Sequence, residues 1–78
     1  MDIFPIYRRL SNNKSFYKIN SNLQFEEIQV IGSKQKYFIH EAIQYPEKLK
    51  IMDMIQLVDH YLESNSDEWG KLIEKKEN

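Results

Sequence analysis

Two histidines and the carboxylates near them are the first residues of this 78-residue chain to consider for acid–base or metal chemistry. His40 precedes Glu41 on a predicted strand, where adjacent side chains point to opposite faces, so the two cannot readily share a ligand. His60 falls on a predicted helix, where Glu63 at i+3 is within reach and the adjacent Asp59 is not. One imidazole and one carboxylate do not make a site, and the chain has no cysteine. We therefore expect no metal centre, no cofactor and no enzyme activity.

A second candidate is a set of alternating aromatic and basic side chains near the N-terminus, which share one face of a predicted hairpin. The set comprises Tyr7, Arg9, Phe16 and Lys18. Lys36 and Phe38 are expected to extend it. Rings that stack on bases, beside cations that follow phosphates, are typical of single-stranded nucleic-acid binding. The same residues are also explained by cross-strand aromatic pairs and a soluble sheet edge, which is the plainer interpretation.

Trp69 and Met54 are the remaining candidates for contact with a partner. Trp69 lies on a short C-terminal segment with Gly70, and a tryptophan there either docks the segment onto the domain or anchors a partner. Met54 lies in a broad apolar arc over residues 49–62, which is wider than one sheet face requires. We expect the C-terminal segment or a second copy of the protein to cover the rest of this arc.

The elements that position these residues begin with a hairpin around Asn12 and Asn13, because asparagine tolerates the backbone angles of tight turns. With this turn, Arg8 faces Tyr17 and Ile6 faces Ile19. Period-2 alternation then predicts a core face that carries Ile6, Leu10, Tyr17 and Ile19.

The apolar pattern changes phase between Phe25 and Ile28. This change favours a strand from about Phe25 to Ile31 with a bulge near Glu26, and a helical turn capped by Ser21 is the other possibility. Gly32 opens a two-residue turn to a fourth strand over residues 36–43. The segment thus completes a four-stranded antiparallel meander.

Helical spacing follows Pro46, which suits the first turn of a helix. The clearest stripe, at i, i+4, i+7 and i+11, consists of Ile51, Ile55, Val58 and Leu62. It predicts one long helix to about Leu62. The Ser64–Asp67 segment then supplies helix-capping residues for a short final helix, and residues 75–78 are expected to form a frayed charged tail.

Composition places the chain among small globular domains, since 41% of residues are hydrophobic and ten are aromatic. Residues 1–40 carry six basic and three acidic side chains, and residues 41–78 carry five and nine. The chain is too short for two domains, so these halves are layers of one domain over residues 1–74. Arg8 and Arg9 interrupt any signal-like apolar run, and no stretch approaches the length of a membrane span. We therefore expect a cytoplasmic protein.

In four short motifs the chain resembles a family of short, uncharacterised bacterial proteins, and this family has no assigned activity. They are Tyr7-Arg8-Arg9-Leu10, Asn13-Lys14-Ser15-Phe16-Tyr17-Lys18-Ile19, Phe25-Glu26-Glu27-Ile28-Gln29 and Tyr45-Pro46-Glu47. They cover the first two-thirds of the chain. The resemblance implies a small stand-alone bacterial protein and transfers no functional residue.

Together these features predict a single α+β domain, in which an antiparallel meander carries one long helix on one face and a short final helix. A non-catalytic protein-interaction or oligomerising module is the expected function, because the apolar arc of residues 49–62 exceeds what the chain can cover. A single-stranded nucleic-acid-binding domain is the alternative.

Overall fold

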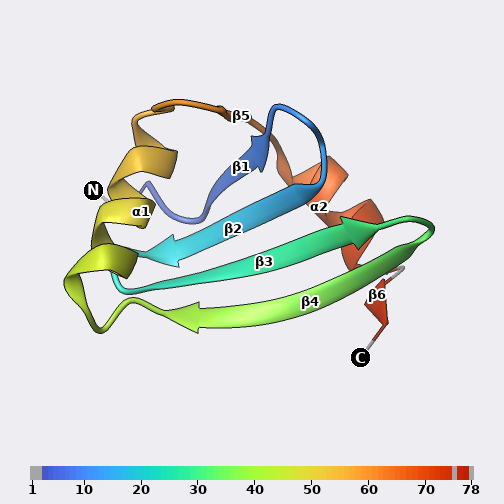
Figure 1. The fold of residues 1–78 in the computed structure, drawn as a ribbon, viewed down its shortest axis with the longest axis horizontal. Helices are drawn as coiled ribbons and strands as arrows, with labels where there is room; N and C mark the ends of the chain where they lie inside the picture. The colour runs from blue at the N-terminus through green and yellow to red at the C-terminus, as the bar shows by residue number, and fades with distance from the viewer. Residues whose placement is uncertain (1–2, 75, 78) are drawn as a thin grey trace.

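The computed structural model describes residues 3–74 and 76–77 and shows an α+β fold built on one sheet (Figure 1). In chain order its elements are β1 (Ile6–Leu10), β2 (Ser15–Ser21), β3 (Gln24–Ile31), β4 (Lys34–Glu41), α1 (Tyr45–Ile55), β5 (Tyr61–Glu63), α2 (Ser66–Ile73) and β6 (Lys76–Glu77). The order across the sheet is β5-β1-β2-β3-β4-β6. Strands β1 to β5 pair antiparallel, and the two-residue β6 pairs parallel with β4. The predicted four-stranded meander is confirmed as β1 to β4.

The first hairpin has the predicted register, in which Ile6 pairs with Ile19 and Arg8 with Tyr17. Asn13 adopts a φ of 60° in its turn, and Gly32 adopts a φ of 62° between β3 and β4. Both turns therefore place positive φ angles on residue types that accept them. These local signals fix which side chains share a face of the sheet.

Residues 24–31 form a regular strand, so neither the bulge near Glu26 nor the helical turn is present there. The irregularity lies instead in β2, between Ile19 and Ser21. The apolar pattern changes phase because both faces of the sheet are buried. Phe25 belongs to one hydrophobic cluster and Ile28 to the other.

The long helix predicted to Leu62 is wrong, because α1 ends at Ile55. Leu57 and Asp59 have φ angles of 58° and 61°, which a continuing right-handed helix cannot accommodate. The chain then returns as β5 and pairs with β1, so that Leu10 lies opposite Tyr61. The backbone groups on the outer edge of β1 gain partners through this pairing. An extended segment therefore replaces the last part of the predicted helix.

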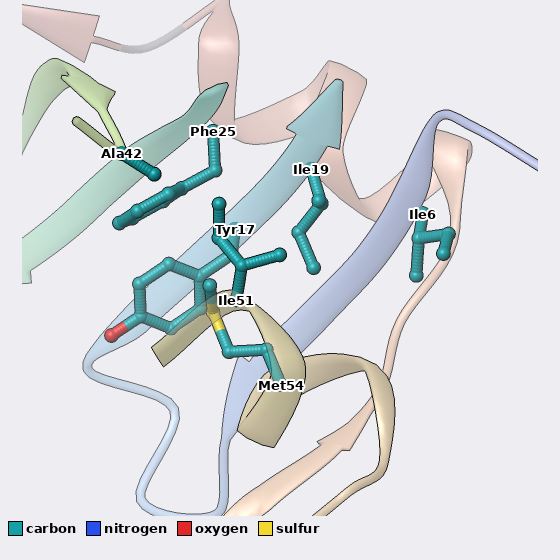
Figure 2. Packing of buried hydrophobic residues seen from close by; sticks show 7 residues of the cluster. All are labelled: Ile6, Tyr17, Ile19, Phe25, Ala42, Ile51 and Met54. Carbon is teal, nitrogen blue, oxygen red and sulfur yellow. The ribbon is translucent and has the colours of Figure 1, made fainter. Parts of the chain in front are cut away.

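Helix α1 covers one face of the sheet and α2 covers the other. Beneath α1, Ile51 and Met54 pack on Tyr17, Ile19 and Phe25 (Figure 2). Ile6 and Ala42 complete this cluster. The second cluster forms where Trp69 of α2 meets Phe16 and Ile28. The sheet is therefore the middle layer of three.

The C-terminal elements agree with the predicted capping chemistry. Asn65 caps α2 by accepting a hydrogen bond of 2.8 Å from the Glu68 main-chain N–H. Of the predicted frayed tail, residues 75 and 78 lie outside the described residues, and Lys76–Glu77 form β6. Among the described residues, neither helix has the length and apolarity that a bilayer span requires.

Candidate protein-interaction surface

The aromatic and basic residues singled out in the sequence lie on the face that α2 covers. Phe16 is buried against Trp69, and the rings of Tyr7 and Trp69 lie 6.5 Å apart between centroids. The two cations of the set are near acids. Arg9 Nε lies 3.8 Å from Glu68 Oε1, and Lys18 Nζ lies 3.9 Å from Glu26 Oε2.

This arrangement weighs against the expected nucleic-acid surface on that face. Stacking on bases requires exposed rings, and Phe16 is in the interior. Lys36 and Phe38 do not extend the set, because they lie on the face that α1 covers. Across the sheet, Phe38 pairs with Glu27, which in turn pairs with Tyr17 of the α1 cluster. Lys36 is on the same face, through Gln29 and Ser15. The candidate residues are therefore divided between the two faces.

Trp69 docks the C-terminal helix, which is the first of the two roles considered for it. Its exposed fraction is 6%, and Leu72 and Ile73 of α2 also pack against its cluster. Met54 lies on the opposite side of the sheet and is fully buried in the α1 cluster. Tyr7, Arg9, Phe16 and Trp69 are thus brought together, whereas Met54 is separate from them.

A buried carboxylate, Glu27, organises a polar group on the α1 side of the sheet. Its Oε1 lies 2.8 Å from His40 Nε2, and Gln29 Nε2 donates to its Oε2 at 3.3 Å. The His40 ring stacks on Phe25 with centroids 4.7 Å apart. Burial, together with the nearby Glu27, raises the pKa of the Tyr17 hydroxyl well above its usual value.

A histidine hydrogen-bonded to a buried carboxylate, as His40 is to Glu27, can serve in acid–base chemistry, but the surroundings of this pair fit a structural role. The Lys50 ammonium lies 5.4 Å from the Tyr17 ring centroid and 5.5 Å from that of Phe25, which is cation–π distance. Within the described part of the chain, every buried side-chain nitrogen and oxygen has a hydrogen-bond partner. Satisfied polar groups of this kind specify how a core is packed.

His60, the second imidazole considered in the sequence, is exposed in the turn before β5. Glu63 lies on β5 rather than one helical turn away, so the spacing that would have brought the two side chains together is absent. The structure therefore places His40 and His60 in unrelated surroundings.

The outer face of α1 is apolar, which is unusual for a helix face that meets solvent. Tyr45, Leu49 and Met52 recur at i, i+4 and i+7, and their exposed fractions are 73%, 40% and 53%. The buried residues Ile51 and Met54 lie on the opposite side of the helix. Because α2 packs on the other face of the sheet, it does not cover this stripe.

Leu23, at the turn between β2 and β3, extends the stripe. It is exposed, and together with Met52, Ile51, Lys48 and Asn22 it lines a hollow beside the helix. We call Leu23, Tyr45, Leu49 and Met52 the α1 surface. Sequence reasoning noted the wide apolar arc but did not select these residues. The feature of the sequence that could have identified Tyr45, Leu49 and Met52 is their i, i+4, i+7 spacing, which places them on the side of the helix opposite Ile51 and Met54.

Comparisons with protein-family models, with curated proteins and with solved structures find no match to this chain.

Proposed function

We propose that this protein is a small, non-catalytic protein-interaction module that receives an amphipathic helix of another polypeptide on its α1 surface. The observation that carries the proposal is the uncovered stripe of Tyr45, Leu49 and Met52. Contiguous exposed apolar side chains on a small protein mark an interaction site. Their i, i+4, i+7 spacing is the spacing of a helix–helix seam, so the partner that fits is another helix.

The charges beside the stripe indicate how such a helix would be oriented. Lys48 lies on one flank of the stripe and Asp53 on the other. A partner helix with acidic residues along one edge of its apolar face and basic residues along the other edge is complementary to these flanks. The hollow between Leu23 and Met52 can accept one large apolar side chain as an anchor.

The test uses a designed, labelled peptide of about five helical turns with leucines at the seam positions. Its edges carry glutamate to face Lys48 and lysine to face Asp53. Fluorescence anisotropy should show saturable binding that is weakened at least about tenfold by Met52→Lys, which places a charge in the seam. A peptide with its two edges exchanged should bind less well than the original.

Ile31→Lys is the matched control, because Ile31 is exposed on β3 and lies outside the α1 surface. It should leave the affinity unchanged. The proposal fails if the parent protein does not bind the peptide at high micromolar concentration. It also fails if Met52→Lys and Ile31→Lys have the same effect on binding.

A further inference from the structure

Helix α1 carries, beside its apolar stripe, one base and one acid whose spacing indicates what the α1 surface binds. Counted as a heptad, Leu49 takes position a and Met52 position d, and Tyr45 is the d residue of the preceding heptad. Lys48 and Asp53 then occupy positions g and e, the two flanks of the seam. Lys48 is exposed and Asp53 is partly exposed. Both charges therefore lie where a second helix on this surface would meet them.

Helix α1 itself has the features that this surface requires of a partner helix. Its seam is apolar, one flank is basic and the other is acidic. In two parallel helices, position g of one helix lies beside the e position of the other that follows five residues further along. Lys48 and Asp53 have this separation, so two α1 helices packed in parallel make the same ion pair twice.

The antiparallel arrangement of the same two helices brings like charges together instead. In that arrangement each flank of one helix faces the same flank of the other. Lys48 then faces the basic flank of the second helix, and Asp53 faces its acidic flank. Like charges that meet across an interface are unfavourable. The charges therefore favour the parallel pair.

We infer that the α1 surface binds α1 of a second copy of this chain, with the two helices parallel about a two-fold axis. This inference rests on the proposed function, because it names the partner of the same surface. Each apolar residue of the seam meets its own counterpart in the second copy, as a two-fold interface requires. Gln56, the exposed C-cap residue, takes the next a position, where two facing amides can hydrogen-bond and fix the register.

The fold accommodates this arrangement because α1 is an outer layer. Ile51 and Met54 point from α1 into the core (Figure 2), and α2 packs on the far face of the sheet. Two copies therefore stack with the paired helices between their sheets. Leu23 lines the hollow beside Lys48 and Met52. It thus lies on the flank that faces the second helix and enlarges the interface.

Charge exchange tests the parallel pairing. Lys48→Glu places a carboxylate opposite Asp53 of the second copy, and Asp53→Lys places an ammonium group opposite Lys48. Each variant alone should self-associate at least about tenfold more weakly than the parent in analytical ultracentrifugation. An equimolar mixture of the two restores both ion pairs and should recover the dimer, which also shows that both variants fold. Lys14→Glu, on an exposed lysine of the β1–β2 turn, is the matched control and should leave association unchanged.

Cysteine crosslinking gives a second readout, because the chain has no cysteine of its own. In the parallel pair, residue 45 and residue 56 each lie beside their counterparts. Tyr45→Cys and Gln56→Cys should therefore both form disulfide-linked dimers under mild oxidation. In an antiparallel pair these positions lie toward opposite ends of the two helices, so at most one of them can crosslink. Ile31→Cys, on an exposed residue of β3, is the control and should stay monomeric.

The outcomes separate this inference from the proposed function. Lys48→Glu should be monomeric, so peptide binding is measured on this variant, with lysine on the peptide edge that faces residue 48. If this peptide binds but the parent is a strict monomer at high micromolar concentration, the second copy is excluded and the proposed function stands. A dimer that Lys48→Glu does not weaken, or that fails to crosslink at both positions, also overturns the inference. If the variant does not bind its peptide, the proposed function fails, and this inference fails with it.

Discussion

The guanidinium group of Arg8 donates a hydrogen bond from Nε to the main-chain oxygen of Met54, 2.8 Å away. Its second amino nitrogen donates to the Ile55 oxygen at 3.1 Å. Both acceptors are in the last turn of α1, which contains no basic residue of its own. A cation from β1 therefore satisfies the helix carbonyls and complements the negative end of the helix dipole.

Replacing Arg8 with methionine should lower the free energy of unfolding by about 1.5–3 kcal/mol, because the hydrogen bonds are charge-assisted and partly buried. Methionine keeps most of the aliphatic stem, so the loss reports chiefly on the cap. Urea denaturation followed by circular dichroism measures it. Arg9→Met is the matched control, because Arg9 makes a side-chain hydrogen bond to Asn13 and a long ion pair with Glu68 near the surface. Its cost should stay below about 1 kcal/mol, and equal costs would contradict the capping role.

Truncation of Trp69 should detach α2 from the sheet. The side chain is buried against Phe16 and Ile28, and Gly70 leaves the helix little intrinsic stability. Trp69→Ala should cost about 3–5 kcal/mol, and Trp69→Phe should cost clearly less because a ring still fills the site. In the parent protein the tryptophan emission should be blue-shifted and move to the red on unfolding. A red-shifted native spectrum would contradict docking.

The hairpins were predictable because their signals are local. Asn12–Asn13 and Gly32–Ser33 identify the turns, and alternation about them fixes which residues face each other. The phase change in β3 indicates a bulge only for a strand with one buried face, and β3 is buried on both faces. Phe25 is buried beneath α1, and Ile28 is buried on the other face only because α2 packs there. The alternation of residues within β3 does not show that a second helix covers that face.

The end of α1 was not predictable from the apolar spacing, because Val58 and Leu62 continue the helical period. The contacts that end the helix join residues far apart in the sequence. The segment after α1 pairs with β1, and Tyr61 packs on Tyr17 with ring centroids 5.8 Å apart. The spacing likewise does not show that the α1 surface is left uncovered. Its exposure depends on which side of the sheet α2 occupies.

Stability should decrease at alkaline pH because of Tyr37, a partly buried tyrosine of β4. Burial and a hydrogen bond to Glu26 raise the pKa of Tyr37 to about 12 from an ordinary value of 10.0. Its contribution is complete below pH 10 and is lost as the pH rises toward 12, because the unfolded chain releases the proton first. Urea denaturation at several pH values should show this decline, and Tyr37→Phe should reduce its slope. Equal slopes for the two proteins would contradict this assignment.

Leu57 is the residue at which a single substitution should increase stability. Its φ of 58° lies in the left-handed region, which costs a residue with a β-carbon roughly 1 kcal/mol relative to glycine. Its side chain is exposed, so Leu57→Gly removes little packing and should relieve that strain, giving a net gain below about 1 kcal/mol. Leu57→Val should have the opposite effect, because a β-branched residue accepts this conformation least readily. Thermal denaturation of the three proteins should rank glycine above leucine and leucine above valine, and the reverse order would show that side-chain contacts, rather than backbone strain, determine stability where α1 ends.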